Sequence, residues 1–444
     1  MDFIQDSGKR ARIFAAIITA SISGSMLATA LSTALPQMIE EFGISMTLGQ
    51  WVTSGFSLTM AIMMPLTAFL IKRFKTRNLF LSASMLFMLG LLLCIVSKDF
   101  TLLMTGRVIQ AIGSGMTSSL AQVITLTIYP PEKKGTAMGW YGLSLAAAPI
   151  IAPALAGIII DAVGWRMIFV ISLVISAMAF IYSCFVIENV LDTSESKFDA
   201  FSFLLSAIAF GGITLGVGNI TKQGPFAIAC LALGLIGATA FSIRQLRLQS
   251  PFLDIRIFKE RSYTFSVLAS MILYLVMMAA SVMIPIYVQS IRGFSATVSG
   301  LIVLPGALAT AAISPLAGKL YDRFGIKVLL LVSSVCLISS NLLTGLASEN
   351  TPIVLIAVYN VVRNIAVGSI MMPLVTWGAS SLPKDRTSDA TALINSLRTI
   401  SGAIGIAVFV SMMNSLGFGI ASICMAAVSA VLLIMAFCVK IVKH

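Results

Sequence analysis

The chain has 444 residues, of which 58% are hydrophobic and only 10% charged, and its mean hydropathy is +1.01. A soluble protein carries about 25% charged residues, so this composition excludes a soluble globular domain and indicates an integral membrane protein. A net charge of +12 would also suit a nucleic-acid binder, but the cations cluster between long apolar segments. That placement indicates orientation in a membrane and not nucleic-acid binding.

Apolar segments long enough to cross a bilayer follow one another along the chain. Each is a continuous run and not a ten-residue alternation, which predicts helices and not barrel strands. We count fourteen, at 13–35, 47–71, 78–97, 101–128, 136–160, 165–187, 200–220, 225–243, 263–289, 296–318, 328–347, 352–381, 389–412 and 416–439. The basic N-terminus lacks a cleavage site, so the first helix is predicted to be retained. All six cysteines lie in apolar runs, and neither disulfides, a metal nor a cofactor is expected.

Basic residues gather in alternate connections. With both termini in the cytoplasm, the cytoplasmic loops and tails hold 22 of the 29 Lys and Arg residues. This is the positive-inside pattern, so we predict an N-in/C-in protein with an even number of helices. Three cations, Arg107, Arg363 and Arg398, remain inside the spans. A membrane arginine either faces a polar space or snorkels to the interface, and three of them predict a water-filled interior.

Two connections share a pattern. Residues 68–77, AFLIKRFKTR, follow the second segment, and residues 318–327, GKLYDRFGIK, follow the tenth. A weaker echo joins TIYPPEKKG, after the fourth segment, to SSLPKDRTS, after the twelfth. With the seventh and eighth segments set aside, the chain reads as two sets of six helices. We therefore predict an N-terminal half at 1–190, two linker helices at 191–260 and a C-terminal half at 261–444.

The second connection resembles the loop signature of the major facilitator superfamily, G-x-L-x-D-R-x-G-x-[RK]. It is matched by Gly318, Leu320, Asp322, Arg323, Gly325 and Lys327. The resemblance implies two parallel six-helix repeats and a latch that holds the cytoplasmic side closed. In the first connection Arg73 keeps the cation, but Lys72 stands at the Asp position and Lys75 at the second Gly. A plain positive-inside loop would explain the cations, but not Gly and Asp at this spacing.

Two further segments extend the resemblance. Residues 106–115, GRVIQAIGSG, are similar to a superfamily motif whose arginine, here Arg107, is associated with proton transfer. Residues 142–157, GLSLAAAPIIAPALAG, are similar to the motif of antiporters, with Pro149, Pro153 and Gly157 as its landmarks and Ala twice in place of Gly. Prolines bend a helix and small residues let helices approach closely. A bent, tightly packed helix without antiporter function is the alternative.

Fourteen helices and this fifth segment resemble the drug:proton antiporter branch that includes the QacA and EmrB type exporters. The resemblance implies a monomeric multidrug efflux transporter, not an enzyme, in the bacterial cytoplasmic membrane. It would export amphiphilic drugs by proton antiport with alternating access. The expected partners are small amphiphilic drugs, protons and the lipid bilayer, with no nucleic acid. The alternative is a dedicated exporter or importer of one native anionic or zwitterionic metabolite.

The first segment departs from that branch. Many members carry an Asp shortly before a T-x-V-N-x-A-L-P stretch, whereas SMLATALSTALP, at 25–36, places Leu27 there. None of the 17 acids lies at mid-membrane. The remaining proton-coupling candidates are Arg107, Glu40, Glu41, Asp161 and Asp389. Asp161 is the best placed, near Arg107 or Arg166; a solvated helix-end charge is the alternative for each carboxyl, and a proton on the substrate would also serve.

Substrate is expected near the midplane, between the halves. The candidate contacts are polar, aromatic or Met residues, which suit a promiscuous cavity. They are Trp51, Phe56, Gln110, Ser114, Tyr274, Met278, Asn360, Arg363, Asn395 and Arg398. Packing is the alternative for each, and Trp51 would also suit an interface anchor. Without mid-membrane acids, the cavity is expected to favour neutral, zwitterionic or anionic amphiphiles over bulky dications.

Overall fold

The computed structural model describes residues 4–193, 198–220, 224–348 and 350–439, apart from the side chains of 28, 29, 32, 46, 47, 148–151, 153–155 and 296. Within these ranges the chain is helical and has no strand. The long helices are α1 (Ser7–Phe42), α3 (Trp51–Arg73), α4 (Thr76–Ile95), α5 (Phe100–Ile128), α6 (Lys134–Val163), α7 (Arg166–Val186), α8 (Ala200–Asn219), α9 (Gly224–Arg247), α10 (Arg261–Ile286), α11 (Ala296–Gly345), α12 (Ile353–Ser380), α13 (Thr387–Leu416) and α14 (Phe418–Cys438). The short ones are α2 (Met46–Gly49), η1 (Pro131–Lys133), η2 (Ile255–Lys259), the π-helical η3 (Tyr287–Ile291) and η4 (Lys384–Arg386).

Eleven helices of the described ranges are long and apolar enough to cross a membrane. Each of the fourteen apolar ranges coincides with a helix, and α11 alone covers two of them. Its two parts meet at Gly325, where φ is 70° and ψ is −177°. Residues with a side chain rarely adopt this backbone conformation, so the glycine at position 325 permits the break in the helix. The predicted all-α membrane architecture is confirmed, while the number of crossings and their orientation stay predictions.

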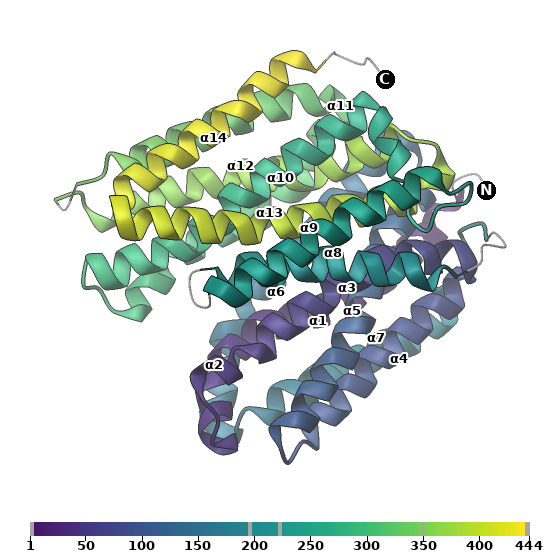
Figure 1. Cartoon of the computed structure of the whole chain (residues 1–444), viewed down its shortest axis with the longest axis horizontal. Helices are drawn as coiled ribbons and strands as arrows, with labels where there is room; N and C mark the ends of the chain where they lie inside the picture. The colour runs from purple at the N-terminus through teal and green to yellow at the C-terminus, as the bar shows by residue number, and fades with distance from the viewer. Residues whose placement is uncertain (1–3, 194–197, 221–223, 349, 440–444) are drawn as a thin grey trace.

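The helices form two groups, which Figure 1 shows one above the other. We call α1–α7 the N-terminal half and α10–α14 the C-terminal half. The α8–α9 pair, here the linker hairpin, lies across the front and contacts α3 of one half and α13 of the other. Both described chain ends lie on the same side, at the right of Figure 1, which we call the termini end.

Buried apolar side chains join the halves at one end only. At the termini end a single cluster holds side chains of both halves, among them Ile13, Phe80 and Val375. Toward the opposite end the clusters separate: one holds only N-terminal residues such as Leu31, and another only C-terminal residues such as Met283. The halves are therefore packed together at the termini end and divided at the other.

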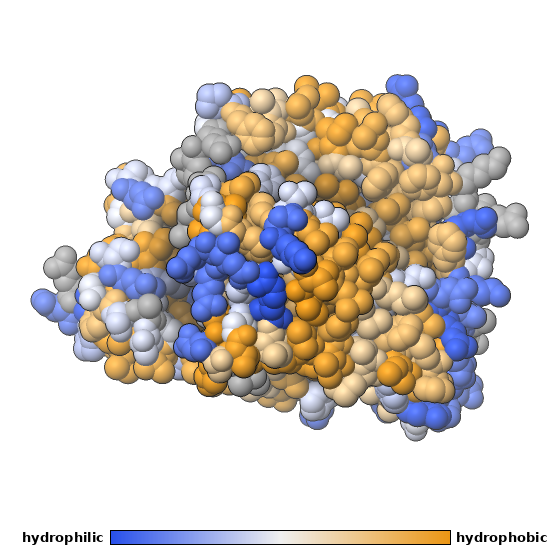
Figure 2. All heavy atoms as spheres, turned by 90° about the horizontal axis from the view of Figure 1, so that it is seen from below, coloured by the Kyte–Doolittle hydropathy of each residue, from blue (hydrophilic) through white to orange (hydrophobic). Residues whose placement is uncertain are grey.

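The outer surface is apolar, as a membrane protein requires. Large hydrophobic side chains project from the bundle, among them Phe185, which is 84% exposed, and Phe437, which is 69% exposed. Figure 2 shows one face, where a broad hydrophobic region lies between hydrophilic residues gathered toward either side. This surface matches a bilayer core bounded by two polar interfaces.

Candidate functional site

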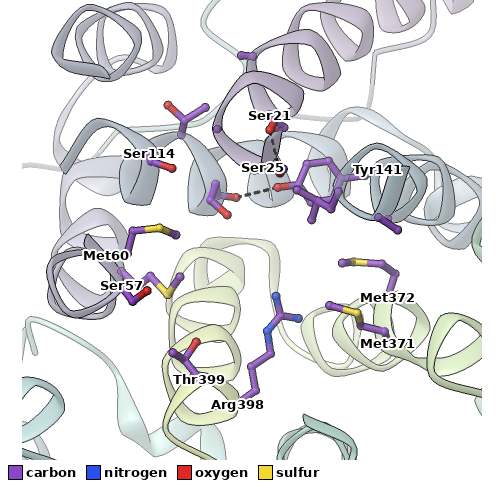
Figure 3. Close-up of a pocket in the computed structure, with 18 of the residues that line it drawn as sticks. Ser21, Ser25, Ser57, Met60, Ser114, Tyr141, Met371, Met372, Arg398 and Thr399 are labelled. Atoms are coloured by element: carbon purple, nitrogen blue, oxygen red, sulfur yellow. Dashed lines mark hydrogen bonds between the residues drawn. The ribbon is translucent and has the colours of Figure 1, made fainter. Parts of the chain in front are cut away.

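A cavity of about 650 Å³ lies between the halves. The N-terminal half lines it with serines and apolar side chains of α1, α3, α5 and α6, and the C-terminal half with residues of α10 to α13. Figure 3 shows Ser25, Met60 and Tyr141 of the first half facing Met371 and Arg398 of the second. Five of the ten predicted substrate contacts line this cavity: Phe56, Ser114, Tyr274, Met278 and Arg398.

Arg398 is the charged residue of the cavity wall. It extends from α13 into the space between the halves (Figure 3), and its guanidinium carbon lies 5.0 Å from the centroid of the Tyr274 ring. The lining residues include no carboxylate. A cation beside aromatic and methionine side chains can bind an anionic group while the rest of the wall contacts apolar surface.

The other five predicted contacts lie outside the cavity wall. Trp51 begins α3 and is half-buried. Asn395 is buried and donates to Gln122 Oε1 of the other half at 3.0 Å. Gln110, Asn360 and Arg363 are buried between helices. Asn395 and Asn360 bond to neighbouring helices, whereas Gln110 and Arg363 bond within their own helix.

Arg107 and Arg363 have similar surroundings. Arg107 donates from Nε to the carbonyl of Val52 at 3.0 Å and from Nη1 to Gln110 Oε1, and lies 4.1 Å from the Phe56 ring centroid. Arg363 donates from Nη2 to Asn360 Oδ1. In each case the amide lies three positions away on the same helix. Both arginines therefore bind neutral oxygen atoms, and Arg107 lies directly behind Phe56 in the cavity wall.

Three predicted proton-coupling carboxyls lie at the end opposite the termini. Glu40 and Asp161 are exposed. Glu41 pairs with Arg166 at 2.6 Å and accepts from Trp165 Nε1 at 2.6 Å. Partial burial opposes ionisation, but these two bonds hold the pKa of Glu41 below its usual value. Arg166 thus pairs with Glu41, and the predicted approach of Asp161 to Arg107 or Arg166 is not what the structure shows.

The motif of residues 318–327 lies where α11 meets α6. Asp322 accepts from the backbone N–H groups of Gly135 and Thr136, both at 2.7 Å, and from the Thr136 hydroxyl at 2.6 Å. A Cβ on Gly318 would come within 2.2 Å of the Gly135 carbonyl oxygen, so this glycine is what lets the helices meet. The carboxylate caps the first turn of α6, where unpaired N–H groups and the helix dipole favour an anion. We call this contact the Asp322 latch.

A second contact joins α3 to α13 at the same end. Lys72 Nζ lies 2.5 Å from Asp389 Oδ2. The Asp389 side chain is 1% exposed and that of Lys72 is 24% exposed, so this ion pair is largely shielded from water. Residues 72 and 389 belong to different halves, and the pair spans the seam between them. We call it the Lys72 latch.

Known proteins place this architecture in a family. The family model described as Major Facilitator Superfamily matches residues 13–406. The chain belongs to the major facilitator superfamily. It is 34% identical over 390 residues to the lincomycin resistance protein LmrB of Bacillus subtilis (strain 168), covering 86% of this chain and 80% of LmrB. It is 28% identical to the multidrug export protein EmrB of Haemophilus influenzae, over 84% of this chain and 74% of EmrB.

These superfamily relatives confirm the resemblance to the drug:proton antiporter branch, and the chain is a multi-pass protein of the cell membrane. Solved structures agree on the fold. The human organic anion transporter MFSD10 has a TM-score of 0.73 at 14% identity, covering 97% of this chain and 100% of that one. The proton:xylose symporter XylE has a TM-score of 0.69 at 12% identity, covering 97% and 96%.

The superfamily motif expected in α6 is only partly described. The side chains of Pro149 and Pro153 lie outside the described residues, and a Cβ on Gly157 would meet nothing within 4 Å. Close packing occurs earlier in the helix instead. A Cβ on Gly139 would lie 2.5 Å from the Ser314 carbonyl oxygen, so α6 presses on α11 near the Asp322 latch. The antiporter role of the motif stays a prediction.

Sequence reasoning missed the partners of both latches. It singled out Asp322 and Asp389, but neither Thr136 nor the pairing with Lys72. The usable signal was the echo between TIYPPEKKG and SSLPKDRTS. These stretches lead into α6 and α13, where Thr136 and Asp389 are each the third residue.

Proposed function

We propose that this chain exports amphiphilic compounds across the cytoplasmic membrane by proton antiport with alternating access. In this proposal the chain crosses the membrane fourteen times and both termini lie in the cytoplasm. The six-helix halves are residues 1–190 and 261–444, and the two linker helices are residues 191–260. The observation that carries it is a cavity between two halves that are joined by two latches at one end and divided at the other. Relatives named for lincomycin and multidrug resistance support export of drugs.

The cavity wall supports a substrate class. Arg398 supplies a positive charge, no carboxylate stands among the lining residues, and Met60, Met278 and Tyr274 supply adaptable apolar surface. A permanent dication would have to approach Arg398 without a counter-charge, which Coulomb repulsion opposes. Neutral, zwitterionic and anionic amphiphiles are therefore the proposed substrates.

Proton coupling needs a group whose surroundings change between the two facing states. Among the helix-end carboxyls, Asp389 meets this condition, because its cationic partner belongs to the other half. Glu40 and Asp161 are exposed, and Glu41 is bound within the N-terminal half. We propose Asp389 as the coupling carboxyl, with Arg107 acting on the cavity through Phe56.

Transport by the purified protein in liposomes tests the proposal. When the liposome lumen is acidic, protein molecules inserted inside-out should transport norfloxacin, a zwitterion, into the lumen far faster than ethidium, a permanent cation. A protonophore should abolish this uptake. Arg398→Gln should narrow this preference, while Arg398→Lys should keep it. Uptake that ignores the pH gradient would reject antiport. Uptake of one metabolite anion, with no drug transported, would favour the dedicated exporter.

A further inference from the structure

A second cavity, of about 490 Å³, lies between the linker hairpin and the outward side of α13. Its wall is almost entirely apolar, with Phe210 of α8, Phe241 of α9 and Leu393 of α13 among the lining side chains. Leu246, which also lines it near the end of α9, is 52% exposed. The cavity is therefore open to the surroundings of the protein, and it shares no lining residue with the central cavity.

The depth of this cavity matches one leaflet. Its deepest lining residues, Ile213 and Ile400, each lie 13 positions beyond the first residue of their helix, α8 or α13. Both helices begin at the termini end. At 1.5 Å of rise per residue this is about 20 Å along the helix, against about 15 Å for half the hydrocarbon core. The cavity thus runs from the termini-end surface to roughly the bilayer centre.

Two cations stand at the mouth. Arg256 and Lys259 of η2 line the same cavity whose floor is apolar. Arg256 Nη2 donates to the carbonyls of Leu246 and Leu248, at 2.9 and 2.7 Å, which leaves its other N–H groups for a further acceptor. Lys259 is exposed. A cationic rim over an apolar slot complements a molecule with an anionic head and a hydrocarbon tail.

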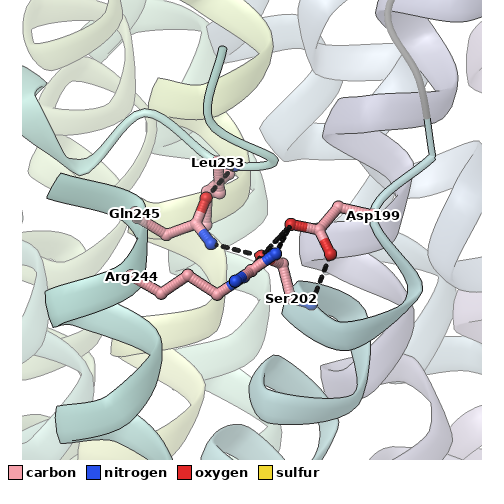
Figure 4. Close-up of polar contacts among 5 residues, drawn as sticks. All are labelled: Asp199, Ser202, Arg244, Gln245 and Leu253. Carbon is pink, nitrogen blue, oxygen red and sulfur yellow. Dashed lines mark hydrogen bonds and ion pairs between the residues drawn. The ribbon is translucent and has the colours of Figure 1, made fainter. Parts of the chain in front are cut away.

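A polar network fixes this mouth in place (Figure 4). Asp199, at the start of α8, pairs with Arg244 of α9 at 2.8 Å. Next to it, Gln245 donates to the Ser202 hydroxyl at 2.7 Å and accepts from the backbone N–H of Leu253 at 3.2 Å. The bond to Leu253 draws the segment before η2 back onto α9. Arg256 is thereby held above the slot before any ligand arrives.

We propose that this cavity binds an acidic phospholipid of the leaflet at the termini end. One acyl chain occupies the slot along α13, and the phosphate meets Arg256 and Lys259. A lipid and not a soluble anion fits, because most of the wall is hydrocarbon and the slot is deep enough for an acyl chain. The bound chain contacts the back of α13, the helix that carries Arg398 on its cavity side. This inference goes beyond the proposed export and does not depend on it.

Native mass spectrometry of the full-length protein tests this site without measuring transport. The protein is titrated with phosphatidylglycerol or phosphatidylcholine, with inorganic phosphate as a soluble competitor. Phosphatidylglycerol should bind about thirtyfold more weakly to Arg256→Gln/Lys259→Gln, because each of the two cations near the membrane surface contributes about 1 kcal/mol. The control Arg12→Gln/Lys133→Gln, two exposed cations of the termini end outside the cavity, should bind as the wild type does.

A second pair of variants tests the slot itself. Ala238→Phe places a ring in the cavity and should release both lipids, whereas Ala232→Phe, on the exposed face of the same helix, should not. The proposal would be overturned if all variants bound phosphatidylglycerol as tightly as the wild type. It would also be overturned if Ala238→Phe and its control Ala232→Phe lost lipid binding to the same extent. Displacement by millimolar phosphate would show a free-anion site instead, and release by norfloxacin would show a second drug site.

Discussion

The two latches occupy equivalent places in the two halves but use different chemistry. Residues 72 and 322 hold the same position in the two loop copies, and their partners, Asp389 and Thr136, are each the third residue of a helix. In one latch Asp322 binds neutral N–H and O–H groups at a helix start. In the other a lysine binds a buried carboxylate. The carboxylate belongs to the 318–327 motif in the Asp322 latch and to the first turn of α13 in the Lys72 latch.

This difference shows that the departure at Lys72 is compensated across the seam. An aspartate at position 72 would face Asp389 at close range, and two adjacent carboxylates repel. The contact between the halves is therefore retained while the charges are exchanged. The first loop lacks the superfamily aspartate, but together with α13 it forms a complete latch. In this latch the loop supplies the cation and the helix supplies the carboxylate.

Breaking the Lys72 latch should have the largest effect. Lys72→Met leaves Asp389 buried without its cation, which costs about 3 kcal/mol, the low end for buried pairs because Lys72 is a quarter exposed. We expect the termini end to open. Pulsed electron paramagnetic resonance between Lys75→Cys and Asp385→Cys labels, in a background without the six native cysteines, should show a longer distance.

The matched control is Lys72→Met/Asp389→Leu. Replacing a buried ion pair by apolar residues is often neutral, so the double variant should return toward the wild-type distance. If the double variant opens as widely as the single one, the pair does not hold the seam.

Breaking the Asp322 latch should have a smaller effect. Asp322→Asn keeps one acceptor for the α6 N–H groups but removes the charge, and hydrogen bonds to charged groups contribute about 1.5–3 kcal/mol. The same label pair should report partial opening. Arg323→Gln, the neighbouring exposed residue, is the control and should leave the distance unchanged. If the label distance is unchanged in Asp322→Asn, the charge of Asp322 does not stabilise the closed termini end, and the Lys72 latch alone holds it closed.

Exchanging the residues of the two latches tests whether their positions are equivalent. Asp322→Lys should abolish drug efflux, and Asp322→Lys/Thr136→Asp should restore part of it, because the double variant reproduces the lysine and aspartate of the other seam. Efflux from intact cells measures this rescue. No gain over Asp322→Lys would show that the positions are equivalent in sequence but not in geometry.

A contact inside the linker hairpin should have the smallest effect. Partial burial of Asp199 raises the pKa of its carboxyl, but hydrogen bonds from Ser202 and Arg244 outweigh burial and lower the pKa. A lowered folded-state pKa stabilises the protein above the ordinary Asp value near 4, and this contribution is lost as pH falls through the folded pKa. Asp199→Asn should lower the melting temperature slightly at pH 7, because exposed pairs contribute about 0–1 kcal/mol. It should have no such effect once the pH has fallen below the lowered folded-state pKa of Asp199. The label distance should stay unchanged, since Asp199 and Arg244 belong to one hairpin.

The sequence predicted the helical membrane fold because length and apolarity suffice for that. It predicted less of the site, because helices that are apolar on all sides carry no period that shows which face turns inward. Arg363 and Arg398 looked alike as membrane arginines, yet only Arg398 reaches the cavity wall. The Lys72 latch joins residues 317 positions apart and needs the packing of α3 on α13.

The linker hairpin also has a consequence for the membrane around the transporter. Because α8 touches both α3 and α13, it covers the seam that the Lys72 latch closes. In the proposed alternating access the halves rock apart at this seam, and acyl chains of the bilayer would then reach its apolar walls from the side. We expect the hairpin to block that lateral route, so that the opening fills with water and solute.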